Sequence, residues 1–301
     1  MREPRASRAS PFGRQDRRRG LRQRVLTAAL LIPPVLLAVF LSTSWPVGIL
    51  GLAAQMICFW ELAVMVSPDN AFIAPVTGLL DYILLTGIVL CQWLGMLRKP
   101  VDPSVWMPYL VAIGICGLLG AGAAILLARG RRGRFVTEMA GLWITAGFAS
   151  LTVLKASFVS GNIVWDWSTP VLLALVPLWI GDTLAIFAGR AFGKHPLAPK
   201  ISPKKTVEGG VANLLGCILG AVGLAYLIRQ PVLVGILVGV ATGILGQAGD
   251  LLESALKRSA NVKDSGNLLP GHGGLLDRID SILLSAPAVA IIVVSLGTHG
   301  G

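Results

Sequence analysis

The sequence predicts an all-α, polytopic integral membrane protein. Of its 301 residues, 54% are hydrophobic and only 14% are charged, and the mean hydropathy is +0.74. These values lie outside the range of a soluble domain, whose solvated surface needs more charge. Apolar runs recur along nearly the whole chain, and a helix needs about 20 apolar residues to cross a hydrocarbon core of roughly 30 Å. The chain therefore has room for about nine transmembrane helices.

The first 24 residues form a basic segment ahead of the first apolar run. Nine arginines stand there against Glu3 and Asp16, so the segment holds most of the net charge of +11. We expect this tail to be disordered on the cytoplasmic side, either near anionic lipid headgroups or acting only as a topogenic signal. The charge therefore does not indicate a nucleic-acid partner.

Residues 25–169 are expected to form the N-terminal transmembrane helices. The first apolar run lacks a small-residue cleavage site and is followed at once by a second, so we interpret it as a retained helix rather than a signal peptide. Glu61 and Asp81 are ionisable residues inside predicted spans, which makes them functional candidates by default. Each stands without a motif, which favours a structural or helix-pairing role over a functional one. The predicted spans are 25–43, 46–66, 73–97, 108–128 and 135–154.

Residues 170–301 are expected to form the catalytic region. Predicted helices at 170–188, 209–228, 231–249 and 276–297 leave two polar loops, 189–208 and 250–275. With the basic tail cytoplasmic, nine spans place both loops on the cytoplasmic side. These loops hold nearly all the remaining polar residues, so chemistry is expected there.

The loop that follows Asp182 has the character of an anion-binding segment. Only about a dozen residues separate Asp182 from Pro170, too few to cross a bilayer, so its carboxylate needs a cation or a buried donor. Thr206 is suited to cap the next helix, and lysines beside a capped helix start suit an anion with several phosphates. A positive-inside loop without a ligand is the alternative. The loop carries Arg190, Lys194, Lys200, Lys204 and Lys205 against the single acid Glu208.

Two pairs of acidic residues flank the second loop. Asp250 and Glu253 share a helix face with Ser254 and Lys257 if the preceding helix continues, and Asp277 and Asp280 share a face at the start of the last helix. Carboxylates at the ends of neighbouring helices could converge on hard divalent cations, which prefer oxygen ligands. Structural salt bridging is the alternative.

Between these helices lies a turn of the form Pro-Gly-His-Gly-Gly. Pro270, Gly271, Gly273 and Gly274 would let the backbone approach a ligand and present N–H groups to it. We expect His272, in the middle of the turn, to contact that ligand rather than to lie in a core.

The segment from Ser254 to Asp280 has the spacing S-x-x-K-R-x4-K-D-x5-P-G-H-G-G-x-x-D-R-x-D. This pattern resembles the signature of the phosphatidate cytidylyltransferase family, the CDP-diacylglycerol synthases. Residues 181–210 are similar to a second stretch of that family, with Ile186 in place of a tyrosine and Val207 in place of an aromatic residue. The resemblance is strong over 181–280 and general over the earlier spans.

The resemblance implies a magnesium-dependent nucleotidyltransferase of phospholipid biosynthesis that converts CTP and phosphatidic acid to CDP-diacylglycerol and pyrophosphate. It implies metal ligation by Asp250 and Asp277, with Asp182 and Asp280 as further ligands or supporting groups. The implied catalytic residues are Asp250, Asp277, Lys257, Arg258, Lys263, Asp264, His272 and Arg278. The implied substrate-binding residues are Ser202, Lys204, Lys205, Thr206, Glu208, Ser254, Gly273 and Gly274.

The expected partners are CTP, phosphatidic acid and membrane lipids, and the expected location is the inner (plasma) membrane with the active site facing the cytoplasm. A second cation and a homodimer are left open. Two alternatives remain at this point. One is a CTP-dependent kinase of a polyprenol or lipid, and the other is an ion-coupled transporter with Asp182 at a broken helix.

Overall fold

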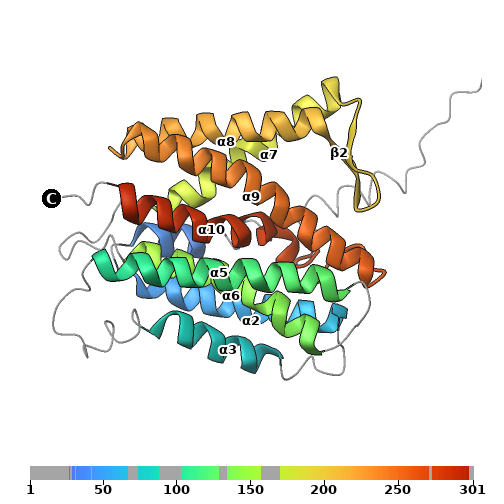
Figure 1. The fold of residues 1–301 in the computed structure, drawn as a ribbon, viewed down its shortest axis with the longest axis horizontal. Helices are drawn as coiled ribbons and strands as arrows, with labels where there is room; N and C mark the ends of the chain where they lie inside the picture. Colours follow the sequence, from blue (N-terminus) through green and yellow to red (C-terminus); the bar gives the residue numbers. More distant parts are fainter. Residues whose placement is uncertain are drawn as a thin grey trace, which may run out of the picture.

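The computed structural model describes residues 27, 29–30, 32–41, 43–66, 74–87, 103–128, 134–156, 170–270 and 273–297. Within these ranges the chain is almost entirely helical (Figure 1). The helices are α2 (Trp45–Val66), α3 (Ala74–Leu85), α5 (Pro103–Ala128), α6 (Arg134–Ala156), α7 (Leu172–Phe192), α8 (Val207–Leu227), α9 (Val232–Ser259) and α10 (Leu276–Leu296). A short hairpin of β1 (Pro196–Ala198) and β2 (Ser202–Thr206) joins α7 to α8.

The prediction of an all-α polytopic membrane protein is confirmed. Among the described residues, six helices are long and apolar enough to cross a membrane: α2, α6, α7, α8, α9 and α10. The expected number of nine is not tested, because parts of the predicted spans 25–43 and 73–97 lie outside the described residues.

Helix α9 continues to Ser259, past the end predicted at 249. The extension is amphipathic, since Leu252 and Leu256 are buried in a core cluster with α2 and α6. Burial of this apolar stripe outweighs the polar composition that suggested a loop. The extension places Asp250, Glu253, Ser254 and Lys257 on a helix, as their spacing required.

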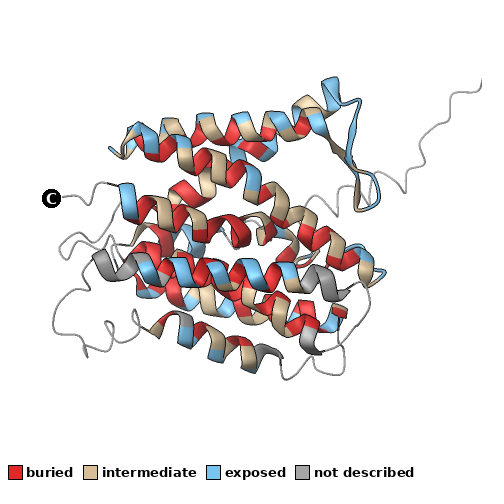
Figure 2. Cartoon of the chain, in the orientation of Figure 1, coloured by how far each residue is buried: buried red, intermediate tan, exposed pale blue. Residues whose placement is uncertain are grey.

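The helices form two groups, and α10 packs against both of them. Helices α7, α8 and α9 pack on one another, whereas α2, α3, α5 and α6 form the other group, and α10 contacts both α9 and α6. Figure 2 shows α10 largely buried between the groups. The hairpin, the end of α9 and the start of α10 lie toward the right-hand end of the bundle in Figure 1.

Small residues bring α7, α8 and α9 close together. A Cβ atom added at Gly216 of α8 would lie 3.0 Å from the Cα atom of Gly181 in α7. Small residues at such contacts let helix backbones approach, as is common in membranes. This close packing fixes the relative positions of the three helices that carry Asp182, Asn213 and Asp250.

The hairpin is anchored where it enters α8. Its strands are antiparallel, with Pro196 opposite Thr206 and Ala198 opposite Ser202. The Thr206 hydroxyl accepts a hydrogen bond from the Gly209 N–H at 3.2 Å, which confirms the predicted helix cap.

Candidate functional site

A cavity of about 580 Å³ lies between α7, the hairpin, α8 and α9, and Ser281 of α10 also lines it. Its wall carries cationic side chains from α7 and β2 and carboxylates from α7 and α9. The charged lining residues are Asp182, Arg190, Lys204, Lys205 and Asp250. The predicted anion-binding loop and Asp250, one member of a predicted acidic pair, therefore meet at one cavity.

Lys205 and Asp250 form an ion pair at the cavity wall. The Lys205 Nζ atom lies 2.5 Å from Asp250 Oδ2, which links the hairpin to α9. Both side chains remain partly accessible, with exposed fractions of 27% and 36%. A ligand entering the cavity can therefore compete for both charges.

Asp182 has the buried donor that its position required. Asn213 Nδ2 donates to Asp182 Oδ1 at 2.9 Å, across the contact between α7 and α8. The charge of Asp250 repels that of Asp182, and Lys205 partly offsets this repulsion. Asp250 likewise repels Asp280 of α10. Negative charge from three helices therefore gathers around Lys205.

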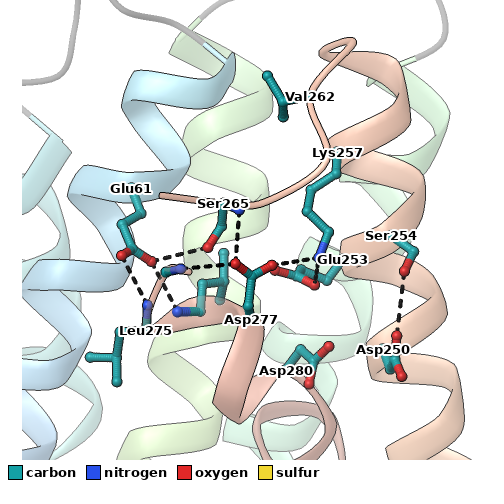
Figure 3. Close-up of polar contacts among 12 residues, drawn as sticks. Glu61, Asp250, Glu253, Ser254, Lys257, Val262, Ser265, Leu275, Asp277 and Asp280 are labelled. Atoms are coloured by element: carbon teal, nitrogen blue, oxygen red, sulfur yellow. Dashed lines mark hydrogen bonds and ion pairs between the residues drawn. The ribbon is translucent and has the colours of Figure 1, made fainter. Parts of the chain in front are cut away.

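A second cluster of charges is buried beside the cavity (Figure 3). Lys257 Nζ lies 2.5 Å from Glu253 Oε2 and 2.5 Å from Asp277 Oδ1. Asp277 Oδ2 accepts hydrogen bonds from the N–H groups of Ser265, at 3.0 Å, and Gly274, at 2.9 Å. Both oxygens of Asp277 are thus engaged by donors of the protein itself. These contacts are the ones expected if Asp277 forms a structural salt bridge.

The four predicted metal ligands are divided between these two environments. Asp182 and Asp250 line the cavity, whereas Asp277 and Asp280 are absent from its lining. Asp280 is buried, and its Oδ1 atom accepts a hydrogen bond from the Ser281 N–H at 2.6 Å. In the described part of the chain, no group of three or more His, Cys, Asp or Glu side chains is arranged to hold a metal ion.

Four of the predicted substrate-binding side chains lie at or next to the cavity. Lys204, Lys205 and Thr206 line it directly. Ser254 donates a hydrogen bond from its hydroxyl to Asp250 Oδ1 at 3.3 Å. Ser202 belongs to β2 but is not among the lining residues.

Glu208 and Arg258 hold the hairpin from its two ends. Glu208 contacts His195, with 2.7 Å between Oε1 and Nδ1. Arg258 donates from Nε to the Ile201 carbonyl at 3.3 Å, which docks the hairpin turn on the end of α9. These two predicted site residues are therefore placed to support the lysine-bearing strand.

The remaining predicted residues belong to the connection from α9 to α10. Lys263 and Asp264 are exposed in it, and Arg278 is exposed on the first turn of α10. Gly273 has a φ angle of +85°, and its N–H and carbonyl pair with Leu269. His272 and Gly271 lie outside the described residues, so the predicted contact of His272 stays a prediction.

Sequence reasoning missed the amide side chains at the cavity. Gln247 and Asn213 both line it, and Gln247 donates from Nε2 to the Gly210 carbonyl at 3.1 Å. The available signal was the presence of polar amides inside otherwise apolar spans. Ile186, where the family pattern has a tyrosine, also lines the cavity, and Val207 is exposed at the start of α8.

Comparisons with known proteins show the family to which this chain belongs. The model of a family described as the cytidylyltransferase family matches residues 22–296. A phosphatidate cytidylyltransferase of Haemophilus influenzae is 33% identical over 89% of this chain and 96% of that protein. One from Staphylococcus aureus is 42% identical over 48% of this chain and 59% of that protein. One from Brucella abortus is 39% identical over 56% of this chain and 62% of that protein. The chain therefore belongs to the cytidylyltransferase family.

Proposed function

We propose that this protein transfers the cytidylyl group of CTP to phosphatidic acid, giving CDP-diacylglycerol and pyrophosphate. The observation that carries the proposal is the cavity at one end of a bundle of membrane-spanning helices. In it, Arg190, Lys204 and Lys205 provide cationic donors beside the carboxylates of Asp182 and Asp250. The names of the similar proteins support the same reaction.

The chemistry requires positioning and charge neutralisation more than a covalent protein intermediate. A phosphate oxygen of the lipid forms a bond to the α-phosphorus of CTP, and the bond from that phosphorus to the bridging oxygen of pyrophosphate breaks. No general base is required, because a phosphomonoester is already largely ionised at neutral pH. The donors of Lys204, Lys205 and Arg190 are suited to hold the triphosphate and to neutralise the leaving group.

Magnesium is part of this proposal. The carboxylates of Asp182 and Asp250 face the cavity, and carboxylate oxygens are the ligands that Mg²⁺ prefers; the ion commonly uses one or two of them together with substrate phosphates. We propose these two residues as its ligands. Asp280 and Asp277 would support them without binding the ion directly. When bound, the ion would neutralise phosphate charge. For Asp277 to become a direct ligand, it would have to release Lys257 or a backbone N–H group.

The same proposal places the protein in the inner membrane with the cavity on the cytoplasmic side. The basic segment of residues 1–24 supports this orientation through the positive-inside rule. One substrate then arrives from water and the other from the leaflet, which accounts for a charged cavity at the end of apolar helices.

The test uses purified protein in detergent with phosphatidic acid and CTP labelled at either the α or the γ phosphate, with and without magnesium. Label from the α position, but not from the γ position, should enter the lipid, and omission of magnesium should abolish the transfer. Entry of γ label would instead identify a CTP-dependent kinase. No lipid label from either position would refute the proposal.

A further inference from the structure

Glu61 of α2 reaches out of the N-terminal helices to the segment that joins α9 to α10. Glu61 is buried, with an exposed fraction of 1%. It accepts hydrogen bonds from the N–H groups of Leu275 and Leu276, both at 2.9 Å, and from the Ser265 hydroxyl at 3.2 Å (Figure 3). Every one of these donors belongs to the connection or to the start of α10.

Glu61 therefore acts as the cap of α10 from a distant part of the chain. The first N–H groups of a helix have no partner within the helix, and a negative charge there is favoured by the helix dipole. Leu275, at the cap position of α10, makes no side-chain cap hydrogen bond. The cap comes instead from a residue more than 200 positions earlier, as the sequence separation of 214 between Glu61 and Leu275 shows.

The capping contact continues into the buried charge cluster through Ser265. The Ser265 hydroxyl donates to Glu61, while its backbone N–H donates to Asp277. Asp277 in turn binds Lys257. A continuous chain of hydrogen bonds and ion pairs thus runs from α2 through the connection to α10 and α9.

Two glycines make room for the Glu61 carboxylate. A Cβ atom at Gly274 would lie 2.7 Å from Glu61 Oε2, and one at Gly266 would lie 2.9 Å from Oε1. Both distances are too short for an undisturbed contact. Gly274 belongs to the Pro-Gly-His-Gly-Gly turn, so the placement of that turn and the placement of Glu61 depend on each other.

We infer that Glu61 is a positioning residue for cytidylyl transfer, which holds the connection 262–276 and the start of α10 beside the cavity. The inference rests on the proposed function. No residue of α2 lines the cavity, so Glu61 acts through the groups that it holds. Loss of its carboxylate should reduce turnover through misplaced groups, with little effect on CTP binding, because misplacement by about 1 Å far from the chemistry can cost on the order of a hundredfold in rate.

The experiment compares Glu61→Ala and Glu61→Gln with Gln55→Ala. Gln55 is a matched control because it is a fully buried polar residue of the same helix, and it donates to Gly78 and Thr145 rather than to the connection. For each variant, kcat, the KM for CTP, the melting temperature and hydrogen exchange of the peptide 262–276 are measured.

Glu61→Ala should lower kcat by about ten- to a hundredfold with the KM for CTP within about twofold, and it should increase exchange in 262–276. Glu61→Gln should recover part of the turnover, since the amide oxygen keeps one acceptor for the capping N–H groups. Gln55→Ala should lower the melting temperature, while its kcat and the exchange of 262–276 stay near the wild-type values.

Two results would overturn the inference. One is a folded Glu61→Ala protein with wild-type kcat and unchanged exchange in 262–276. The other is a loss of kcat in Gln55→Ala as large as that in Glu61→Ala, which would mean that both variants act only by destabilising the protein. If Glu61→Ala does not fold, Glu61→Gln decides on the same two readouts. Failure of the proposed function is distinct, because the wild-type protein would then lack the transfer while the exchange difference persisted.

Discussion

Lys205 of the hairpin and Asp250 of α9 pair directly at the cavity wall, with 2.5 Å between Nζ and Oδ2. This contact fixes the Lys205 side chain at the cavity wall and ties β2 to α9. In the proposed reaction, the Asp250 carboxylate would bind magnesium and the Lys205 ammonium would bind phosphate of CTP. The pair is therefore a natural first target for substitution.

Lys205→Ala should lower kcat/KM for CTP by about ten- to a hundredfold, since loss of one charge-assisted contact to phosphate costs on the order of 1.5 to 3 kcal/mol. Lys204→Ala should act in the same direction, because Lys204 also lines the cavity. Steady-state kinetics at varied CTP measures the effect. Lys200→Ala is the matched control, since Lys200 is exposed in the hairpin turn and does not line the cavity. Wild-type kinetics in Lys204→Ala and Lys205→Ala would assign the loop a topological role only.

Asp250→Asn and Asp277→Asn should fail in different ways. Asp250 lies in the cavity, so Asp250→Asn should melt near the wild-type temperature and lose transfer by several orders of magnitude. It should also lack the upward shift in melting temperature that we expect magnesium to produce in the wild-type protein. Asp277→Asn should unfold early, because it weakens the pairing of buried Lys257, and breaking a buried ion pair costs about 3 to 5 kcal/mol. Thermal melts with and without magnesium, run beside the activity assay, separate the two cases. An Asp277→Asn protein with wild-type melting but no magnesium response would instead assign Asp277 directly to the metal.

Asn213→Ala should impair both stability and turnover, because it removes the amide that donates to Asp182. Asp182 is accessible in the cavity, so the loss is that of one hydrogen bond, about 0.5 to 1.5 kcal/mol. The melting temperature and kcat are the measurements. Ser285→Ala is a suitable control, since that buried hydroxyl donates to carbonyls of its own helix, and its turnover should be unchanged. Equal effects in both variants would mean that Asn213 has no specific link to the site.

Deletion of residues 1–20 should leave the specific activity in detergent nearly intact. The segment is rich in arginine and contains none of the residues assigned to the site. Activity per amount of folded protein is the measurement, with orientation in reconstituted vesicles as a second one. A folded truncated protein that has lost turnover would contradict the topogenic interpretation.

The sequence was sufficient to predict those features that are set by residues close together in the chain. Composition was sufficient for the membrane class, and the Thr206 cap followed from its position before an apolar run. The predicted end of α9 at residue 249 was wrong. Its last turns are stabilised by burial of Leu252 and Leu256 against other helices, and the polar residues around them suggested a loop instead. The face shared by Asp250 and Lys257 followed from helical spacing alone.

The long-range choices could not be predicted. Asp277 is expected beside Asp250, but its carboxylate is held by Lys257 and by the backbone of the connection. Asp182 and Asn213 meet only because glycines bring α7 and α8 close together. Glu61 carried the signal of an ionisable residue inside a span, but its partners lie in a segment that no local pattern connects to it.

The capping of α10 by Glu61 also has a consequence for biosynthesis. Helix α2 is translated before α10. The Glu61 carboxylate therefore lacks these three donors until the connection and α10 have been synthesised. A chain that contains only the C-terminal helices lacks these three contacts to the signature segment. A chain divided between α6 and α7 should therefore regain the site only when both pieces are made together in one membrane.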